Sequence, residues 1–82
     1  MVEISKRPGF ISASIGDYRA EVHTRTGITS FYRGATWLGN MMLERVTSEN
    51  GRSYMRLHPW NIGAPCAAVV ALERALLATV AA

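Results

Sequence analysis

The sequence predicts an α+β fold, an antiparallel β-meander of four to five strands with a C-terminal α-helix packed on one face. Turn-forming dipeptides recur at regular intervals in the first part of the chain, and apolar and polar residues alternate between them. The last segment is rich in alanine and leucine and has no glycine beyond Pro65. The 82 residues have room for one small core, so we expect a lead-in at 1–9 and a single domain at 10–82.

The predicted turns lie at Gly16-Asp17, Thr26-Gly27, Gly39-Asn40 and Asn50-Gly51. Asn-Gly is among the strongest hairpin dipeptides, because both central residues of its turn must tolerate a positive φ. The segments between these turns are short and carry alternating apolar and polar residues, which is typical of strands. We therefore expect strands at residues 10–15, 18–25, 28–38, 41–49 and 52–58.

A two-residue loop at Gly16-Asp17 would fix the register of the first two strands. It pairs Ile15 with Tyr18, Ala13 with Ala20, and Ile11 with Val22. A second such loop at Thr26-Gly27 pairs Val22 with Phe31. One face then collects the apolar members of these pairs and is expected to be buried. The opposite, solvated face collects Ser12, Ser14, Arg19, Glu21, His23, Arg25, Ser30 and Tyr32.

The segment around residues 34–47 allows two interpretations. Gly34 interrupts a strand pattern and predicts a bulge or bend there. Residues 36–47 read as strand, but Thr36 could also cap a helix with an apolar stripe. That stripe would consist of Trp37, Leu38, Met41, Met42 and Val46. We prefer the strand interpretation of residues 36–47, and the helix remains the alternative.

The C-terminal segment Pro65 to Val80 predicts the helix. Asn61 is the expected N-cap, and Trp60 is expected to pack on Pro65 as a hydrophobic staple. The apolar arc comprises Cys66, Val69, Val70, Leu72, Leu76, Leu77 and Val80. The remaining surface is mainly alanine, at Ala67, Ala68, Ala71, Ala75 and Ala78. Such a small-residue surface is compatible with a homodimer through this helix.

Charge and cysteine content indicate the environment of the protein. Nine Lys and Arg residues against six Asp and Glu give a net charge of +3, and all of the excess lies in residues 1–60. An anionic partner would therefore meet the first part of the chain.

A single cysteine forms no internal disulfide, so a cytoplasmic location is expected. The N-terminus does not resemble a secretory signal, and Glu73 and Arg74 interrupt the apolar tail, so no membrane contact is expected.

No catalytic motif stands out, and we expect neither an enzyme nor a bound cofactor or metal. The sequence has no C-x-x-C, no H-x-x-x-H, no glycine-rich phosphate loop and no G-x-S-x-G. A dyad of Cys66 with His58 is conceivable at the start of the helix. A lone cysteine on an apolar arc is more often core filler, and this reading is preferred.

The solvated face of the sheet is the candidate binding surface, because cations and rings alternate on it. Phe10 and His58 are expected beside the partner-binding residues, and Trp60 stands in the loop before the helix. The predicted partner-binding residues are Arg19, His23, Arg25, Tyr32, Tyr54, Arg56 and Trp60. Rings flanked by arginine on an open sheet are typical of modules that bind single-stranded nucleic acid. A plain solvated sheet shows the same residues, and tryptophan and arginine also dominate protein interfaces.

The function expected from these features is that of a small non-enzymatic binding protein. The leading hypothesis is an inhibitor that contacts a host protein complex, of the anti-CRISPR-like kind that phages and mobile elements encode, an inference from size class and not from particular residues. One alternative is a single-stranded nucleic-acid-binding module that uses the exposed sheet face. Another is a small dimeric structural or chaperone-like subunit.

Overall fold

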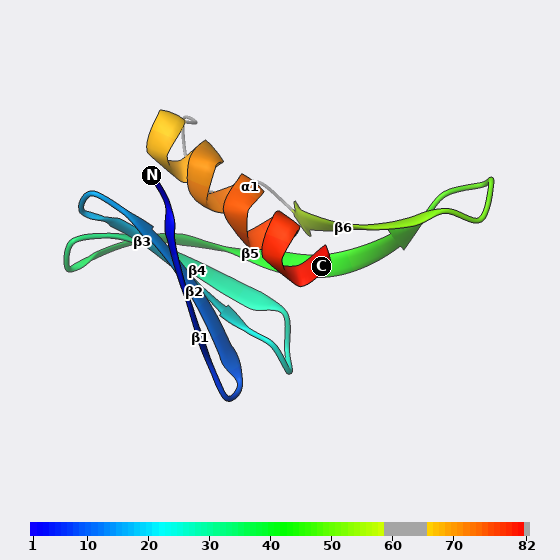
Figure 1. Cartoon of the computed structure of the whole chain (residues 1–82), viewed down its shortest axis with the longest axis horizontal. Coiled ribbons are helices and arrows are strands. Elements are labelled where there is room, and N and C mark those ends of the chain that lie inside the picture. The colour runs from blue at the N-terminus through cyan, green and yellow to red at the C-terminus, as the bar shows by residue number, and fades with distance from the viewer. Residues whose placement is uncertain (59–65, 82) are drawn as a thin grey trace.

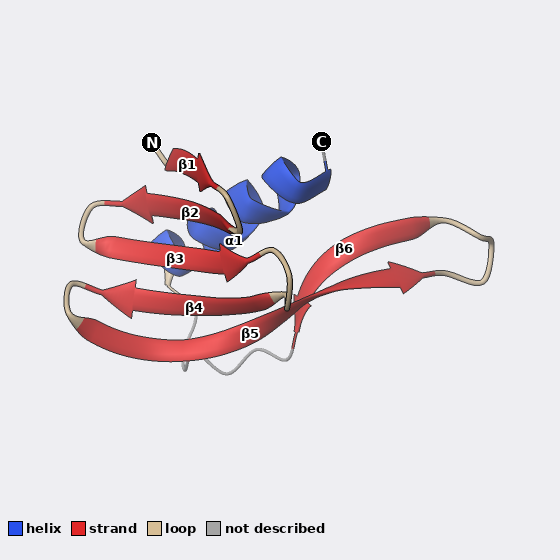
Figure 2. Cartoon of the chain, turned by 90° about the horizontal axis from the view of Figure 1, so that it is seen from below, coloured by secondary structure: helices blue, strands red, loops and turns tan. Residues whose placement is uncertain are grey.

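The computed structural model describes residues 1–58 and 66–81. The chain forms six strands followed by one helix. They are β1 (Glu3–Arg7), β2 (Phe10–Ile15), β3 (Tyr18–His23), β4 (Ile28–Arg33), β5 (Thr36–Thr47), β6 (Ser53–His58) and α1 (Ala67–Ala81). The strands make one antiparallel sheet in sequence order. The helix lies across one face of the curled sheet, where it contacts β2, β3 and β6 (Figures 1 and 2).

The predicted α+β class with an antiparallel meander is confirmed, but the predicted count of four to five strands is wrong. The sixth strand is β1, which lies within the segment expected as a lead-in. It pairs with β2 from Arg7 opposite Phe10 to Glu3 opposite Ser14. The reversal uses Pro8-Gly9, in which proline presets the first central residue and Gly9 has a φ of 83°. The sequence carried this turn signal, and the prediction missed it.

The predicted turn at Gly39-Asn40 is wrong, and the bulge or bend predicted at Gly34 is a full turn, so the turn and the bulge are exchanged. The chain reverses after β4 at Gly34-Ala35, where Gly34 has a φ of 58°. The bulge lies in β5, because Phe31 pairs with Gly39 whereas Tyr32 pairs with Trp37. The strand β5 therefore joins the end of the segment predicted at 28–38 to the segment predicted at 41–49, and its first half pairs with β4 and its second with β6. The strand interpretation of residues 36–47 is confirmed over the helix.

The register predicted for the first hairpin is confirmed, and the register predicted for the second is shifted by two residues. Val22 lies opposite Thr29, and Ala20 lies opposite Phe31. The loop is longer than expected, since the Gly27 N–H donates to the His23 carbonyl at 2.8 Å. A shift of two residues preserves the face on which each side chain lies. Phe31 is therefore buried as predicted although its partner is different.

The core lies between α1 and the covered face of the sheet. Its fully buried large side chains include Phe31 of β4 and Leu72 and Leu76 of α1. The residues of the predicted apolar arc differ in burial, because Leu72 and Leu76 are fully buried whereas Val70 and Val80 are only half-buried. The helix begins at Ala67, later than predicted, and the Val70 N–H donates to the Cys66 carbonyl at 3.0 Å. The predicted cap Asn61, the staple Trp60 and Pro65 lie outside the described residues.

Neighbouring turns are hydrogen-bonded to one another at both ends of the sheet. At one end the Thr24 N–H donates to the Gly9 carbonyl at 3.1 Å. At the other end the Gly34 N–H donates to the Asp17 carbonyl at 2.8 Å, and Arg33 Nε lies 3.3 Å from Asp17 Oδ2. The hydrogen bond that the Arg33 side chain donates to the Asp17 carboxylate raises the pKa of Arg33, and the charges of Tyr18 and Asp17 raise it further. These links hold successive hairpins in a fixed relation.

Among the described helical residues, none forms a helix with the length and apolar character needed to cross a membrane.

Candidate binding surface on the open face of the sheet

The face of the sheet opposite α1 is covered by no other described element, and we call it the open face (Figure 2). Side chains alternate along each strand, so every second residue points to this face. On β2 to β5 the open face carries Phe10, Ser12, Ser14, Arg19, Glu21, His23, Ile28, Ser30, Tyr32, Trp37, Asn40 and Met42. The predicted solvated face therefore exists, with Arg25 as an exception discussed below.

Cross-strand pairing arranges these residues in rows perpendicular to the strands. The central row is polar and small and consists of Ser5, Ser12, Glu21, Ser30 and Asn40. The row on one side runs through Arg7, Phe10 and His23. The row on the other side runs through Ser14, Arg19, Tyr32 and Trp37. Aromatic rings and arginines thus flank a polar floor on both sides.

Three of the rings on the open face, Phe10, His23 and Tyr32, are in contact with a cation or with another ring. The guanidinium of Arg19 lies 4.5 Å from the centroid of the Tyr32 ring, and that of Arg7 lies 5.3 Å from the Phe10 centroid. Phe10 and His23 meet edge to face with their centroids 4.4 Å apart. Exposed cation–π contacts contribute about 0.5–1 kcal/mol each. Each contact favours the side-chain conformer that makes it by about this amount.

Carboxylates neutralise several of the predicted binding cations. Glu21 Oε1 lies 3.5 Å from Arg19 Nη1 and 3.9 Å from Arg7 Nη2, so one central carboxylate serves both flanking rows. On the β5–β6 hairpin, Arg56 Nε donates to Glu44 Oε1 at 2.6 Å. His58 Nδ1 lies 3.8 Å from the same oxygen. The open face and the β5–β6 hairpin therefore both have less unpaired positive charge than the count of their arginines indicates.

The structure brings together some of the predicted partner-binding residues and separates others. Arg19, His23 and Tyr32 share the open face of β3 and β4. The prediction that Arg25 belongs to a strand is wrong, because it lies in the loop between β3 and β4. That loop spans four residues instead of two, which ends the strand earlier. Trp60 lies outside the described residues.

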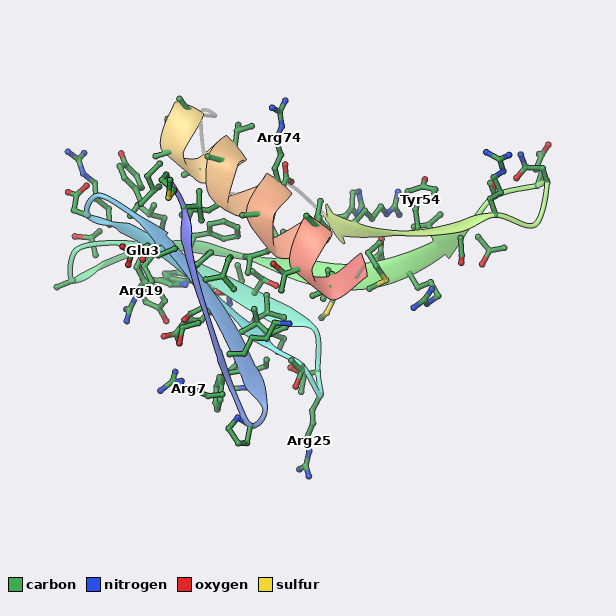
Figure 3. The ribbon with its side chains drawn as sticks, in the orientation of Figure 1. Glu3, Arg7, Arg19, Arg25, Tyr54 and Arg74 are labelled. Atoms are coloured by element: carbon green, nitrogen blue, oxygen red, sulfur yellow. The ribbon has the colours of Figure 1, made fainter. Side chains whose placement is uncertain are left out.

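Tyr54 and Arg56 belong to a different part of the surface. They lie on β6, whose outer half forms a ribbon with β5 that extends beyond the other strands (Figures 2 and 3). Met55 and Leu57 point to the other side of this ribbon, and Leu57 is buried. Tyr54 is accordingly distant from Arg19 in Figure 3. The predicted single patch is therefore two patches.

Sequence reasoning missed the apolar part of the open face. Ile28 pairs with Met42 across β4 and β5, and the two residues are 39% and 40% exposed. Trp37 is 58% exposed, and its indole N–H donates to Asn40 Oδ1 at 3.0 Å. Alternation from Tyr32 back to Ile28 was a usable signal, because both residues have the same parity. No signal was available for Trp37, because the bulge at Leu38 reverses the alternation.

The groups considered for catalysis lie in unremarkable surroundings. Cys66 packs against the hydrophobic core at the start of α1, as the core-filler reading predicted. Over residues 1–58 and 66–81, no three His, Cys, Asp or Glu side chains are close enough to share a metal ion. The open face offers rings, apolar side chains and paired charges, which are groups suited to docking.

Comparisons of this chain with protein family models, with curated proteins and with solved structures found no match, and the geometry of the open face is what carries the inference of function.

Proposed function

We propose that this chain is a non-enzymatic binding protein that docks onto another protein through the open face of its sheet. The observation that carries the proposal is the exposure of Ile28, Met42 and Trp37 on the same face as two arginines that share the Glu21 carboxylate. Protein interfaces combine an aromatic and apolar centre with a polar rim, and charged residues are depleted at their centre. The open face carries both kinds of side chain, with its rings and apolar residues in the two rows that flank the polar central row.

The partner we propose is a protein surface that presents apolar side chains to the two flanking rows and polar groups to the central row. The contacts among these side chains support this choice, since conformers that are already favoured in the free protein lose less conformational entropy on association. Arg19 is held by Tyr32 and Glu21, and Trp37 is held by Asn40. A partner that buries these groups would not have to order them first.

Single-stranded nucleic acid is the less favoured ligand. Its binding depends on cations that are free to replace counterions along the phosphates. Arg7 and Arg19 share Glu21, and Arg56 contacts Glu44. A phosphate would have to compete with these carboxylates for the same guanidinium groups.

The more specific hypotheses remain predictions. An inhibitory action on a host defence complex would require a host protein as the partner. A homodimer through α1 would use the outer surface of the helix, on which Ala67, Arg74 and Ala78 are exposed. This surface lies on the far side of the molecule from the open face, so variants can separate the two modes.

Docking through the open face is tested by asking whether variants of this face lose a partner protein that the wild type and a control variant still bind. Tagged wild-type protein, the variants Met42→Glu and Trp37→Glu, and the control Arg74→Glu on the exposed side of α1 are used to capture partners from nuclease-treated lysate. A captured protein is then purified and rebound to each variant. We expect the Arg74→Glu variant to bind like the wild type and the two face variants to lose at least tenfold in affinity, about 1.4 kcal/mol. Equal binding by all variants would refute docking through the open face.

A further inference from the structure

A hollow of about 390 Å³ lies at one end of the open face. The β1–β2 turn and the β3–β4 loop meet there, and the residues that line it are Pro8, Gly9, Phe10, His23 and Arg25. The hydrogen bond from the Thr24 N–H to the Gly9 carbonyl, 3.1 Å long, joins the two turns. Gly9 has no side chain, and the space that a Cβ would occupy is open, since no other heavy atom lies within 4 Å of that position. The walls of the hollow are therefore fixed by backbone pairing.

The lining combines ring surfaces with positive charge. Phe10 and His23, whose ring centroids are 4.4 Å apart, line the hollow together with Pro8. Arg25 is exposed and lines the hollow, and Arg7 lies over the Phe10 ring. Among the described residues that line the hollow, none carries a carboxylate. Apolar walls with a few polar groups at the rim are the usual composition of a binding pocket.

The charge around the hollow favours an anionic occupant of low charge. Lys6, Arg7 and Arg25 lie at this end of the sheet, and the nearest acid, Glu21, contacts Arg7 at 3.9 Å. Arg25 has no ion pair within the described part of the chain. One free guanidinium beside a ring suits a single carboxylate next to an aromatic group, since a carboxylate accepts the guanidinium N–H groups directly.

We infer that this hollow receives an aromatic side chain and a neighbouring carboxylate from a segment of the partner protein. The inference rests on the proposed function and adds to it the chemistry by which the partner is recognised. The ring of the partner packs against Phe10 and His23, and its carboxylate pairs with Arg25. Such an anchor at the edge of the open face sets the orientation of the docked partner.

The inference is tested without the partner itself. Backbone amide shifts of the 15N-labelled protein are followed while a blocked dipeptide of aspartate and phenylalanine is added. The blocked dipeptides of asparagine with phenylalanine and of aspartate with alanine are the controls for charge and ring. We expect the largest shifts at Gly9, Phe10, His23 and Arg25. Affinity for the first dipeptide should exceed that for either control by about fivefold.

Two matched variants test whether Arg25 causes the preference for the aspartate dipeptide over the asparagine dipeptide. Arg25→Gln should remove the advantage of aspartate over asparagine, whereas Arg52→Gln, at the exposed tip of the β5–β6 loop, should leave it intact. Unchanged amide positions away from the hollow show that each variant is folded. The inference is overturned if none of the dipeptides shifts these amides, or if Arg25→Gln keeps the preference. It is also overturned if adenosine monophosphate binds more tightly than the charged dipeptide, which would identify a nucleotide site.

This result is distinguishable from failure of the proposed function. Dipeptide binding depends on Arg25 and Phe10, whereas docking by the open face depends on Met42 and Trp37. If the dipeptide binds but Met42→Glu still captures the partner normally, only the docking proposal fails. If Met42→Glu loses the partner but the dipeptides cause no shifts, only the anchor proposal fails.

Discussion

The guanidinium of Arg19 on β3 lies 4.5 Å from the ring centroid of its cross-strand neighbour Tyr32 on β4. The same side chain reaches Glu21, two residues along its own strand, at 3.5 Å. Arg19 is therefore held between a ring and a carboxylate on the surface of the sheet. This relationship explains how the open face exposes arginine and aromatic side chains while it keeps much of its charge paired, and it supports several tests.

Removing the carboxylate of Glu21 should raise the affinity of the open face for single-stranded nucleic acid. Glu21→Gln frees Arg7 and Arg19 together, because both contact Glu21 Oε1. We expect affinity for an oligothymidylate of about 16 nucleotides to rise roughly fivefold to tenfold at about 50 mM salt. Fluorescence anisotropy measures the change. Glu49→Gln in the β5–β6 loop alters the net charge equally, and an equal rise in that control would show that pairing at Glu21 does not matter.

Gly27 should not tolerate a side chain. Its φ is +79°, and a Cβ would lie 2.6 Å from the Leu43 carbonyl oxygen. We expect Gly27→Ala to lower the free energy of unfolding by about 2–4 kcal/mol, from backbone strain and from displacement of β5. Gly51 has a similar φ of +82° with nothing within 4 Å, so Gly51→Ala should cost only about 1 kcal/mol. Urea denaturation compares them, and equal losses would contradict the steric contribution.

The two sides of the predicted helical arc should differ in energy. Leu72 is fully buried, and Leu72→Ala should reduce the free energy of unfolding by about 2–5 kcal/mol. Val70 is only half-buried, and alanine has the higher helix propensity, so Val70→Ala should change stability by less than about 1 kcal/mol. Thermal and urea unfolding provide the values. Similar losses at both sites would mean that α1 packs on the sheet by a different face.

The short contact between Arg56 and Glu44 should contribute little to stability. Arg56 Nε lies 2.6 Å from Glu44 Oε1, but the side chains are 44% and 38% exposed. Solvent screens such pairs, so Glu44→Gln should cost about 0.5 kcal/mol, and the difference should vanish at about 1 M salt. Urea midpoints at low and high salt make the comparison. A loss that persists in high salt would show that Glu44 acts through packing of the hairpin.

The sequence by itself determined the class of the fold and the sidedness of its first strands. Alternation placed Ala13, Ala20 and Phe31 on the buried face, and Gly16-Asp17 fixed the first hairpin. Alanine and leucine specified the helix. Sidedness survived even where the register was wrong, because the second hairpin is shifted by two residues and the side-chain period is also two.

Only the tertiary structure decided which of two glycine positions reverses the chain. Gly34 and Gly39 both tolerate positive φ, so local conformational preference does not distinguish a turn from a bulge. Pairing of β5 with β4 and β6 makes Gly34 the turn, and the resulting bulge carries Trp37 onto the open face. The pairing of Arg7 and Arg19 with one Glu21 likewise depends on neighbours across strands. Periodicity records which face a side chain occupies, whereas contacts between strands determine what that side chain meets.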